Sequence, residues 1–411
     1  MEQIQIIKNN CQRQNTDTGV YAYDSTANVR KLHESIPTYK PTALADLKDF
    51  ANKSGIKTML VKDESTRFGE QAFKPLGGVY AMFRVICEEL GLDYRLTTLD
   101  QLLDKPQYKD AISKMTFITT TDGNHGRGVS WASGIFGAKS YVYMPKGTVP
   151  VRAENIRRAG NAHVEITDLL YDDCVKYTAK LARDNGWYLI QDTSWQGYEK
   201  IPTWIMLGYT TMAYEALKQM KSLGYDKPTH VFLQAGVGSM AGAVAAGLEA
   251  TYGEKKPIIS CVEPTQVACI YESMKAADGK PHTSTGNNTT IMAGLNCATP
   301  CGIAWNYLRD YSEFAFSVPD EITKSGMRLL AHPQGNDPKV VSGESGAVTT
   351  GLVNALLNNP EYKNMKDELG LNENSVVLVF STEGNTDPDN YKAIIGCQIC
   401  NDNGNNSNCK G

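Results

Sequence analysis

The sequence lacks the features that define several large classes of protein. No run of apolar residues reaches the roughly 18 that span a bilayer, and the N-terminal MEQIQIIKNNCQRQ has no continuous apolar stretch typical of a secretion signal. A formal net charge of -4 leaves no excess of basic side chains, which argues against nucleic acid as a partner. We therefore expect a soluble, cytoplasmic protein that binds neither membranes nor nucleic acid.

Disulfides and metal clusters are poorly supported as well. Ten cysteines in 411 residues do not form the dense framework of a small secreted domain, and most of them lie in apolar surroundings typical of small core residues. The C-terminal CQICNDNGNNSNC supplies Cys397, Cys400 and Cys409 but no evident fourth ligand. No metal site is predicted.

Alternating apolar and helical segments fill the chain. Short uninterrupted runs such as IKTMLV, SYVYM, THVFL and SVVLVF are each followed by a segment with helical periodicity. This order predicts an α/β protein with two domains, each an open, twisted, mostly parallel sheet flanked by helices. We expect residues 1–74 and 213–411 to form the larger domain and residues 75–212 an inserted smaller one. A helix is predicted over 43–54, ended by Gly55.

Two glycine-rich turns follow predicted strands. In QAGVGSMAGAV, residues 234–244, a strand turns into a small-residue helix whose free amides and dipole could hold a phosphate. A dinucleotide is the rival ligand, with Glu263 at the end of the next strand for a ribose hydroxyl, although the spacing G-x-G-x-x-x-G departs from the dinucleotide pattern. This keeps open a nucleotide-binding oxidoreductase or regulatory module. The second turn, TTTDGNHGRG at 119–128, offers amides to an anion in the same way.

Lys74 stands in the sequence FKPLGG, between an aromatic ring and a proline and just before two glycines. AFKPLGG, DGNHG, the 236–242 glycine loop, VEP and FSTEGN follow one another in an order that resembles the fold-type II pyridoxal-phosphate enzymes, the tryptophan synthase β group. The resemblance covers most of the chain. TTDGNHGRGVSWA, IQDTSWQGYEKIPTWIMLGY and STEGNTDP are similar, more narrowly, to the diaminopropionate ammonia-lyases.

This resemblance implies pyridoxal 5'-phosphate as the cofactor, bonded to the amine of Lys74. The amine reacts only when neutral, and burial beside Phe73 and near other cations is expected to lower its pKa. The phosphate would meet the amides of the glycine loop, Asn124 the ring hydroxyl, and Ser381 or Thr382 the ring nitrogen. A neutral hydroxyl at that nitrogen favours elimination over transamination. The complete predicted cofactor-binding set is Phe73, Lys74, Asn124, Gly236, Val237, Gly238, Ser239, Met240, Glu344, Ser381 and Thr382, where Glu344 either faces the cofactor or simply begins a helix.

The reaction implied is α,β-elimination of ammonia from a small amino-acid substrate, 2,3-diaminopropionate, in its L and D forms. The products are pyruvate and two ammonia. Lys74 is the expected base on one face of the substrate, and Asp122, where most of the superfamily has serine, is the expected base on the other. Asp192 either binds the β-ammonium group or caps the following turn. A serine or threonine dehydratase of the same fold is the alternative, and the family implies a homodimer.

Overall fold

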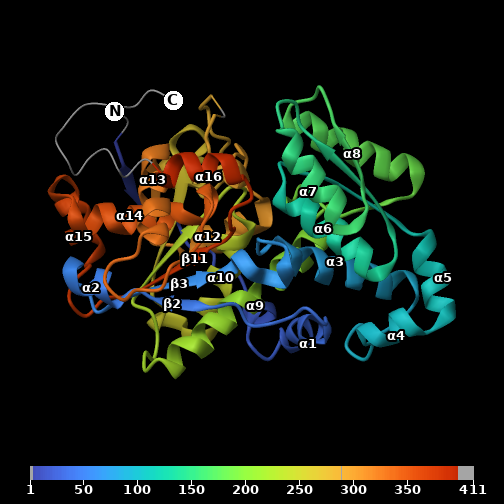
Figure 1. Cartoon of the computed structure of the whole chain (residues 1–411), viewed down its shortest axis with the longest axis horizontal. Coiled ribbons are helices and arrows are strands. Elements are labelled where there is room, and N and C mark those ends of the chain that lie inside the picture. The colour runs from blue at the N-terminus through green and yellow to red at the C-terminus, as the bar shows by residue number, and fades with distance from the viewer. Residues whose placement is uncertain (1–2, 288, 397–411) are drawn as a thin grey trace.

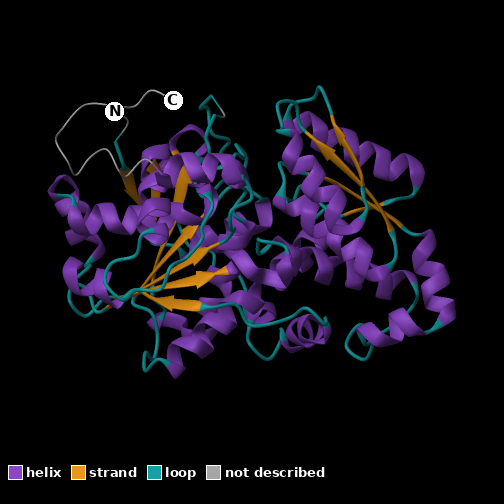
Figure 2. Ribbon diagram, in the orientation of Figure 1, coloured by secondary structure: helices purple, strands orange, loops and turns teal. Residues whose placement is uncertain are grey.

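Two β-sheets lie at opposite ends of the long axis of the molecule (Figures 1 and 2). The computed structural model describes residues 3–287 and 289–396, so Cys397, Cys400 and Cys409 lie outside the described residues. The larger sheet contains β1 (Gln5–Lys8), β2 (Leu44–Asp46), β3 (Thr58–Asp63), β8 (His230–Gln234), β9 (Ile258–Pro264), β10 (Phe314–Val318) and β11 (Val376–Ser381). The smaller sheet contains β4 (Thr116–Thr120), β5 (Lys139–Met144), β6 (His163–Ile166) and β7 (Tyr188–Leu189).

The sheets are mostly parallel, which confirms the predicted α/β class. The larger sheet has the order β1-β10-β9-β8-β11-β3-β2, and its two edge strands are antiparallel to their neighbours. The smaller sheet has the order β6-β5-β4-β7 and only parallel pairs. Parallel strands are joined by crossovers, so the chain segments between them form helices that cover both faces of each sheet.

Helices from two parts of the chain, residues 27–54 and 200–395, pack around the larger sheet (Figure 1). They are α1 (Ala27–Ser35), α2 (Lys48–Ser54), α9 (Lys200–Ser222), α10 (Ser239–Tyr252), α11 (Cys269–Ala276), α12 (Gly302–Tyr311), α13 (Asp320–Ala331), α14 (Glu344–Asn358), α15 (Lys363–Leu369) and α16 (Pro388–Ile395). The helices at the smaller sheet are α3 (Lys74–Glu89), α4 (Leu99–Asp104), α5 (Pro106–Lys114), α6 (Asn124–Phe136), α7 (Pro150–Gly160) and α8 (Tyr171–Asn185).

The alternation of side chains along β11 divides the core of the larger sheet into two layers. Val377 and Val379 pack in the layer that contains α13 and α14, whereas Leu378 and Phe380 pack in the layer that contains α9 and α10. All four side chains are at most 1% exposed. Successive side chains of a strand point to opposite faces, so the unbroken apolar run SVVLVF supplies both layers, each buried side chain contributing about 1.5–3 kcal/mol.

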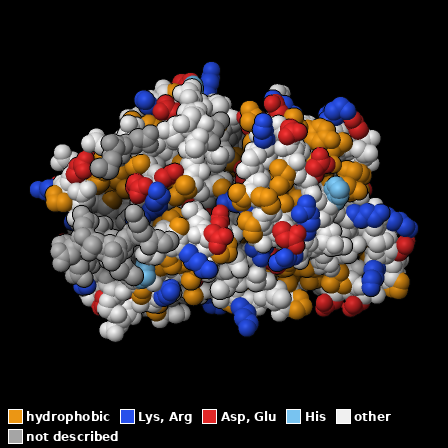
Figure 3. Space-filling model, turned by 45° about the horizontal axis from the view of Figure 1, so that its top comes forward, with side chains coloured by type: hydrophobic (Ala, Val, Ile, Leu, Met, Phe, Trp, Pro, Cys, Tyr) orange, Lys and Arg blue, Asp and Glu red, His pale blue; other side chains and the backbone are white. Residues whose placement is uncertain are grey.

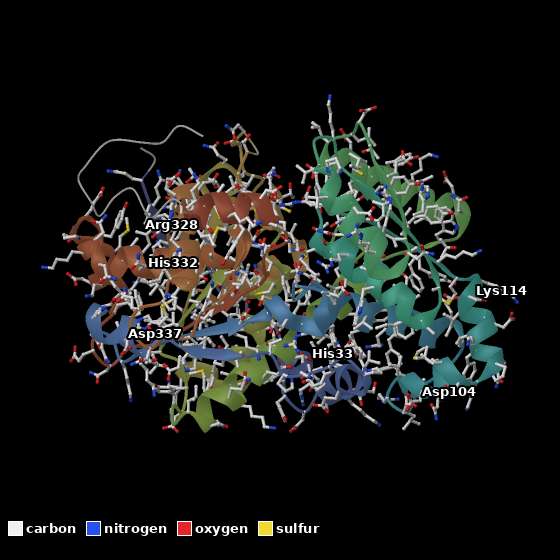
Figure 4. The ribbon with its side chains drawn as sticks, viewed as in Figure 1. His33, Asp104, Lys114, Arg328, His332 and Asp337 are labelled. Atoms are coloured by element: carbon white, nitrogen blue, oxygen red, sulfur yellow. The ribbon has the colours of Figure 1, made fainter. Side chains whose placement is uncertain are left out.

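The predicted helix over residues 43–54 is shorter than expected. Leu44–Asp46 forms the edge strand β2 instead, with Ala45 opposite Val61 of β3, and only Lys48–Ser54 is helical. The start of α2 is fixed by Asp337, labelled in Figure 4, whose carboxylate accepts hydrogen bonds from the amides of Asp49 and Phe50, both at 2.8 Å. Gly55, at φ +72°, ends the helix as predicted.

Close packing of α3 against α9 explains the glycines that follow Lys74. A Cβ atom on Gly77 would lie 2.6 Å from Cε1 of Tyr209, and one on Gly208 would lie 2.4 Å from the carbonyl oxygen of Leu76. Side chains at these two positions would force the helices apart. The glycines therefore keep the start of α3, and with it Lys74, close to α9.

His33 supports the start of α3 from below (Figure 4). Its Nε2 donates to the carbonyl oxygen of Leu76 at 2.9 Å, which leaves Nδ1 to accept from the Thr211 hydroxyl at 2.8 Å. Burial lowers the pKa of His33 to about 3, so the ring stays neutral and keeps this arrangement at physiological pH.

Buried ion pairs fix the segment that leads from β3 to Lys74. The Arg67 guanidinium donates to Glu64 at 2.8 Å and to Glu215 of α9 at 2.7 Å, and the Lys62 ammonium donates to the same Glu215 oxygen at 2.7 Å. Burial acts to raise the pKa of Glu215, but the charges of Arg67 and Lys62 hold it at about 2. Two cations and two anions compensate one another here, and removal of one partner would leave an uncompensated buried charge.

Among residues 3–287 and 289–396, no helix combines the length and the apolar character that a membrane crossing requires. Acidic and basic side chains are interspersed over the face shown in Figure 3.

Candidate active site

One cavity collects the ends of strands from both sheets. The turns after β4, β7, β8 and β11 all contribute to it, together with the start of α3. Ligands of parallel sheets bind beyond the carboxyl ends of the strands, and the cavity lies at such ends in both sheets. The lining residues are Phe73, Lys74, Thr120, Thr121, Asp122, Gly123, Asn124, His125, Tyr171, Asp192, Gln234, Ala235, Gly236, Val237, Gly238, Ser239, Met240, Gly294, Leu295, Cys297, Ser345, Thr382 and Glu383.

Lys74 and Asp192 form an ion pair in this cavity. The Lys74 Nζ donates to the Asp192 Oδ2 at 2.5 Å, and the amine lies 5.3 Å from the ring centroid of Phe73. Burial acts to lower the pKa of Lys74, but the Asp192 carboxylate raises it above its ordinary value. The expectation of a lowered pKa was therefore wrong for this arrangement, because the partner 118 residues further along the chain outweighs desolvation.

Asp192 is held as a charged group. Its side chain is 7% exposed, and burial opposes its charge, but His125 and Lys74 hold its pKa at about 2. His125 donates from Nε2 to the carbonyl oxygen of Ile190 at 2.7 Å, and its Nδ1 lies 3.7 Å from the Asp192 Oδ2. The Ser239 hydroxyl donates to the Asp192 carbonyl oxygen at 2.7 Å. Asp192 is thus a fixed anion placed to bind an amine.

The turn from β8 to α10 has the geometry of a phosphate cradle. Gly238 adopts φ +91°, in the left-handed region that favours glycine. A Cβ atom on Gly236 would lie 3.1 Å from the Cα of Leu295, so this position also favours glycine. The bond from the Gly242 amide to the Gly238 carbonyl, at 2.8 Å, starts the helical ladder, which leaves the preceding amides free to meet an anion.

The two candidate hydroxyls for the ring nitrogen, those of Thr382 and Ser381, differ in whether they line the cavity. Thr382 lines the cavity, and its Oγ1 accepts from the Gln234 amide at 2.9 Å. Ser381 does not line the cavity, and its hydroxyl donates to the Ser342 hydroxyl at 2.8 Å. Gln234 Oε1 is buried without a hydrogen-bond partner in the described part of the chain. Buried polar atoms are rarely left unpaired, so the cavity suits a polar ligand such as the predicted cofactor.

Asn124 and Glu383 lie together at the edge of the cavity. Asn124 is the first residue of α6, and its amide donates to the Glu383 carboxylate at 2.5 Å. The other Glu383 oxygen accepts from the Ser345 amide at 2.8 Å. Glu383 therefore links the turn after β4 in the smaller sheet to the larger sheet, a role that nothing in the motif FSTEGN indicates.

Asp122 lies in the turn after β4, and its side chain lines the cavity. Burial raises the pKa of Asp122 to about 7, and Asp192 adds to the rise while Arg152 opposes it. A general base works best with a pKa close to the operating pH. The position and the pKa of Asp122 both suit proton abstraction at neutral pH.

Glu344 and Glu263, the two acidic residues considered as ligand contacts, are not among the residues that line the cavity. Glu344 begins α14, accepts a hydrogen bond from the Asn390 amide, and is not among the residues that line the cavity. Glu263 is fully buried and accepts from the amides of Ile270 and Tyr271 at 2.8 and 2.7 Å. Glu263 therefore caps the start of α11, and it is not available to a ribose hydroxyl beside the glycine loop.

The predicted site residues did not include Tyr171 and Cys297, which line the cavity, or Tyr209, which packs against Phe73. Tyr171 begins α8, and burial, together with Cys297 and Asp192, raises the pKa of its hydroxyl well above the ordinary value. Burial likewise raises the pKa of Cys297 above its ordinary value. The Tyr209 ring is tilted against that of Phe73 with centroids 4.7 Å apart, and burial raises the pKa of its hydroxyl while Lys74 opposes the rise. Of these three residues, only Tyr209 belongs to a motif named above, IQDTSWQGYEKIPTWIMLGY. Its position in the helical pattern is the same as that of a core residue.

A buried lysine at a helix start, a glycine-rich turn after a strand and a cavity between two mostly parallel sheets together suit a pyridoxal-phosphate enzyme. Residues 36–381 match the family of pyridoxal-phosphate dependent enzymes, and the chain belongs to this family. The predicted cofactor and the predicted enzyme class are thereby confirmed.

The comparisons narrow the family further. The chain is 46% identical over 367 residues to diaminopropionate ammonia-lyase from Escherichia coli K12, covering 89% of this chain and 90% of that protein. A holo structure of that enzyme from Escherichia coli has a TM-score of 0.88 at 43% identity and covers 96% of both chains. Its complex with D-serine has a TM-score of 0.88 at 42% identity, covering 96% and 97%. Within the pyridoxal-phosphate enzymes, the chain belongs to the diaminopropionate ammonia-lyase family.

Proposed function

We propose that the protein eliminates ammonia from L- and D-2,3-diaminopropionate, giving pyruvate and two ammonia. The observation that carries this proposal is the 2.5 Å pair between the Lys74 amine and the Asp192 carboxylate. An anion that holds an amine in the cavity is suited to hold the β-ammonium group that distinguishes this substrate from serine or threonine. The 46% identical relative bears the same activity in its name.

Pyridoxal phosphate, when bound, supplies the electron sink for the charge left by the α-proton. Residues 236–240 would hold its phosphate through their amides, and Asn124 would meet the ring hydroxyl. Thr382 would hold the ring nitrogen: its oxygen already accepts from Gln234, so its own hydrogen is free to be donated. Side chains of the protein transfer the protons and bind the substrate.

Protons move between three side chains of the cavity. Lys74 must lose a proton before it can bond to the cofactor, and Asp122, which lines the same cavity and whose pKa burial raises to about 7, is the proposed acceptor. Once Lys74 is occupied by the cofactor, the Asp192 carboxylate is left to bind the β-ammonium group. Lys74, freed by the substrate amine, and Asp122 then serve as bases on opposite faces of the substrate.

The stoichiometry of the products tests this function. The purified enzyme is expected to release two ammonia per pyruvate from L- and from D-2,3-diaminopropionate. A dehydratase would prefer serine or threonine and would release one ammonia per 2-oxo acid, which is pyruvate from serine and 2-oxobutyrate from threonine. Bound nicotinamide nucleotide in place of pyridoxal phosphate would favour the oxidoreductase alternative. Release of one ammonia per pyruvate with serine as the better substrate would contradict the proposal.

An Asp192→Asn variant is expected to lose about 10- to 100-fold more kcat/KM on diaminopropionate than on serine. A hydrogen bond to a charged group contributes roughly 1.5–3 kcal/mol, and serine has no β-cation to lose it. Parallel steady-state assays with both substrates measure the difference. Asp184→Asn, which removes an exposed carboxylate paired with Lys180, is the matched control. Equal losses on the two substrates would indicate that Asp192 only caps or positions the following turn.

We further propose that the enzyme is a cytoplasmic homodimer. The support is the family resemblance together with the absence of a membrane-crossing helix among the described residues.

A further inference from the structure

A second cavity, of about 550 Å³, adjoins the active-site cavity. One wall is a face of α8, from which Asp172, Val175, Lys176, Ala179 and Arg183 contribute side chains at intervals of three or four residues. The opposite wall consists of residues 193–195 and 297–300. We call this space the α8 cavity. It is larger than a substrate as small as diaminopropionate requires.

The α8 cavity and the active-site cavity are neighbours that share lining residues. Tyr171, Val237 and Cys297 line both cavities. The hydroxyl of Tyr171 accepts from the Gln191 amide at 3.3 Å, next to Asp192 in the chain. Asp192 lines the active-site cavity, and Tyr171, Val237 and Cys297 lie between that cavity and the α8 cavity, so a substituent on a nitrogen at Asp192 has the α8 cavity as a neighbouring space.

The residues that follow Asp192 in the chain line the α8 cavity. Thr193, Ser194 and Trp195 directly follow Asp192 and line the α8 cavity. The Ser194 hydroxyl accepts from the Ile303 amide at 3.1 Å, which fixes this segment against α12. Trp195 is 37% exposed and stacks on Tyr198 with centroids 4.4 Å apart, which supports a flat apolar surface at this wall.

We propose that the enzyme also accepts 2,3-diaminopropionates that carry an alkyl or arylmethyl group on the β-nitrogen, with that group in the α8 cavity. The proposal rests on the proposed function, because it places the β-nitrogen at Asp192. An alkylated nitrogen remains a cation and keeps its ion pair with Asp192, whereas an acylated nitrogen is a neutral amide and loses it. The expected substrates are therefore β-N-alkyl and not β-N-acyl compounds.

The reaction balances without an oxidant or reductant. A base removes the α-proton, the Cβ–N bond breaks with its electron pair on nitrogen, and the substituted amine leaves. One water hydrolyses the remaining enamine. The products are one pyruvate, one ammonium and one alkylammonium ion per substrate, in place of the two ammonium ions from diaminopropionate.

The test uses the holoenzyme with β-N-benzyl-2,3-diaminopropionate. Equal amounts of benzylamine and pyruvate are expected, with no product from the β-N-benzoyl compound. Ala179→Trp fills the α8 cavity and should lower kcat/KM for the benzyl substrate by about 10- to 100-fold, since overfilling a packed site is costly. Its kcat/KM for diaminopropionate should change by less than about threefold. Thr148→Trp, in a neighbouring cavity beyond Asp122, is the matched control and should leave both substrates unaffected.

Each outcome decides the proposal. If the enzyme forms pyruvate from diaminopropionate but no benzylamine from the benzyl compound, this inference is overturned and the proposed function stands. If neither substrate gives pyruvate, the inference and the proposed function are both overturned. Loss of benzyl turnover in Thr148→Trp but not in Ala179→Trp overturns the assignment to the α8 cavity. If Ala179→Trp fails to fold, as loss of turnover on diaminopropionate would reveal, Thr299→Trp narrows the cavity from the opposite wall and decides instead.

Discussion

A Lys74→Ala variant is expected to lose its turnover of both isomers of diaminopropionate by roughly 10³-fold or more. Lys74 has two tasks, to bond the cofactor and to move a proton, and general acid–base catalysis alone supplies about 10²–10⁴ in rate. The visible absorbance of the lysine-bound cofactor should disappear in the variant. Pyruvate assays and absorbance spectra of the purified proteins, with the cofactor in excess, measure both effects.

Two further variants separate the covalent task of Lys74 from its charge. Lys74→Arg keeps a cation beside Asp192 but cannot bond the cofactor, so it should be as inactive as Lys74→Ala. Lys109→Ala, which removes an exposed lysine of α5, should behave as the unaltered enzyme. An unchanged visible spectrum in Lys74→Ala would show that another amine holds the cofactor, and activity in Lys74→Arg would show that charge alone is enough.

Local backbone chemistry explains why so much of the site could be predicted from the sequence. Gly238 adopts a left-handed φ of +91°, and Gly236 lies close to Leu295. Both conditions favour glycine, so they can be recognised in the sequence as glycines. Strands with both faces buried, such as β11, appear as unbroken apolar runs. The parallel strands of one sheet share a carboxyl edge, so Asp122 and Thr382 could each be placed at such an edge, and the order of the motifs along the chain placed them together with Lys74.

Features set by distant partners could not be predicted in this way. The pKa of Lys74 depends on Asp192, and that residue's place beside the amine is fixed only when the two sheets come together. Residues 44–46 become a strand because they pair with β3, while Asp337 fixes the start of the helix that follows. Glu263 caps a helix whose position no local pattern revealed. In each case a tertiary contact decides what the local sequence left open.

An Asp122→Asn variant is expected to lose about 10²–10⁴-fold of its turnover of D-diaminopropionate and much less of its turnover of the L isomer. The two isomers present their α-protons to opposite faces, and a positioned general base contributes about that factor. Asn cannot accept a proton, whereas Lys74 still serves the other face. Separate kcat/KM measurements on the two isomers give the ratio directly.

The pH dependence of the same variant supplies a second, independent readout. Burial and Asp192 raise the pKa of Asp122 from its ordinary value to about 7, and a base acts only when deprotonated. In the unaltered enzyme, kcat/KM for the D isomer should therefore fall as the pH drops through about 7, and Asp122→Asn should lose this limb. Asp104→Asn, at an exposed position of α4 (Figure 4), should retain it. Equal losses on both isomers, or a D-isomer profile that keeps its limb in Asp122→Asn, would show that one base serves both faces.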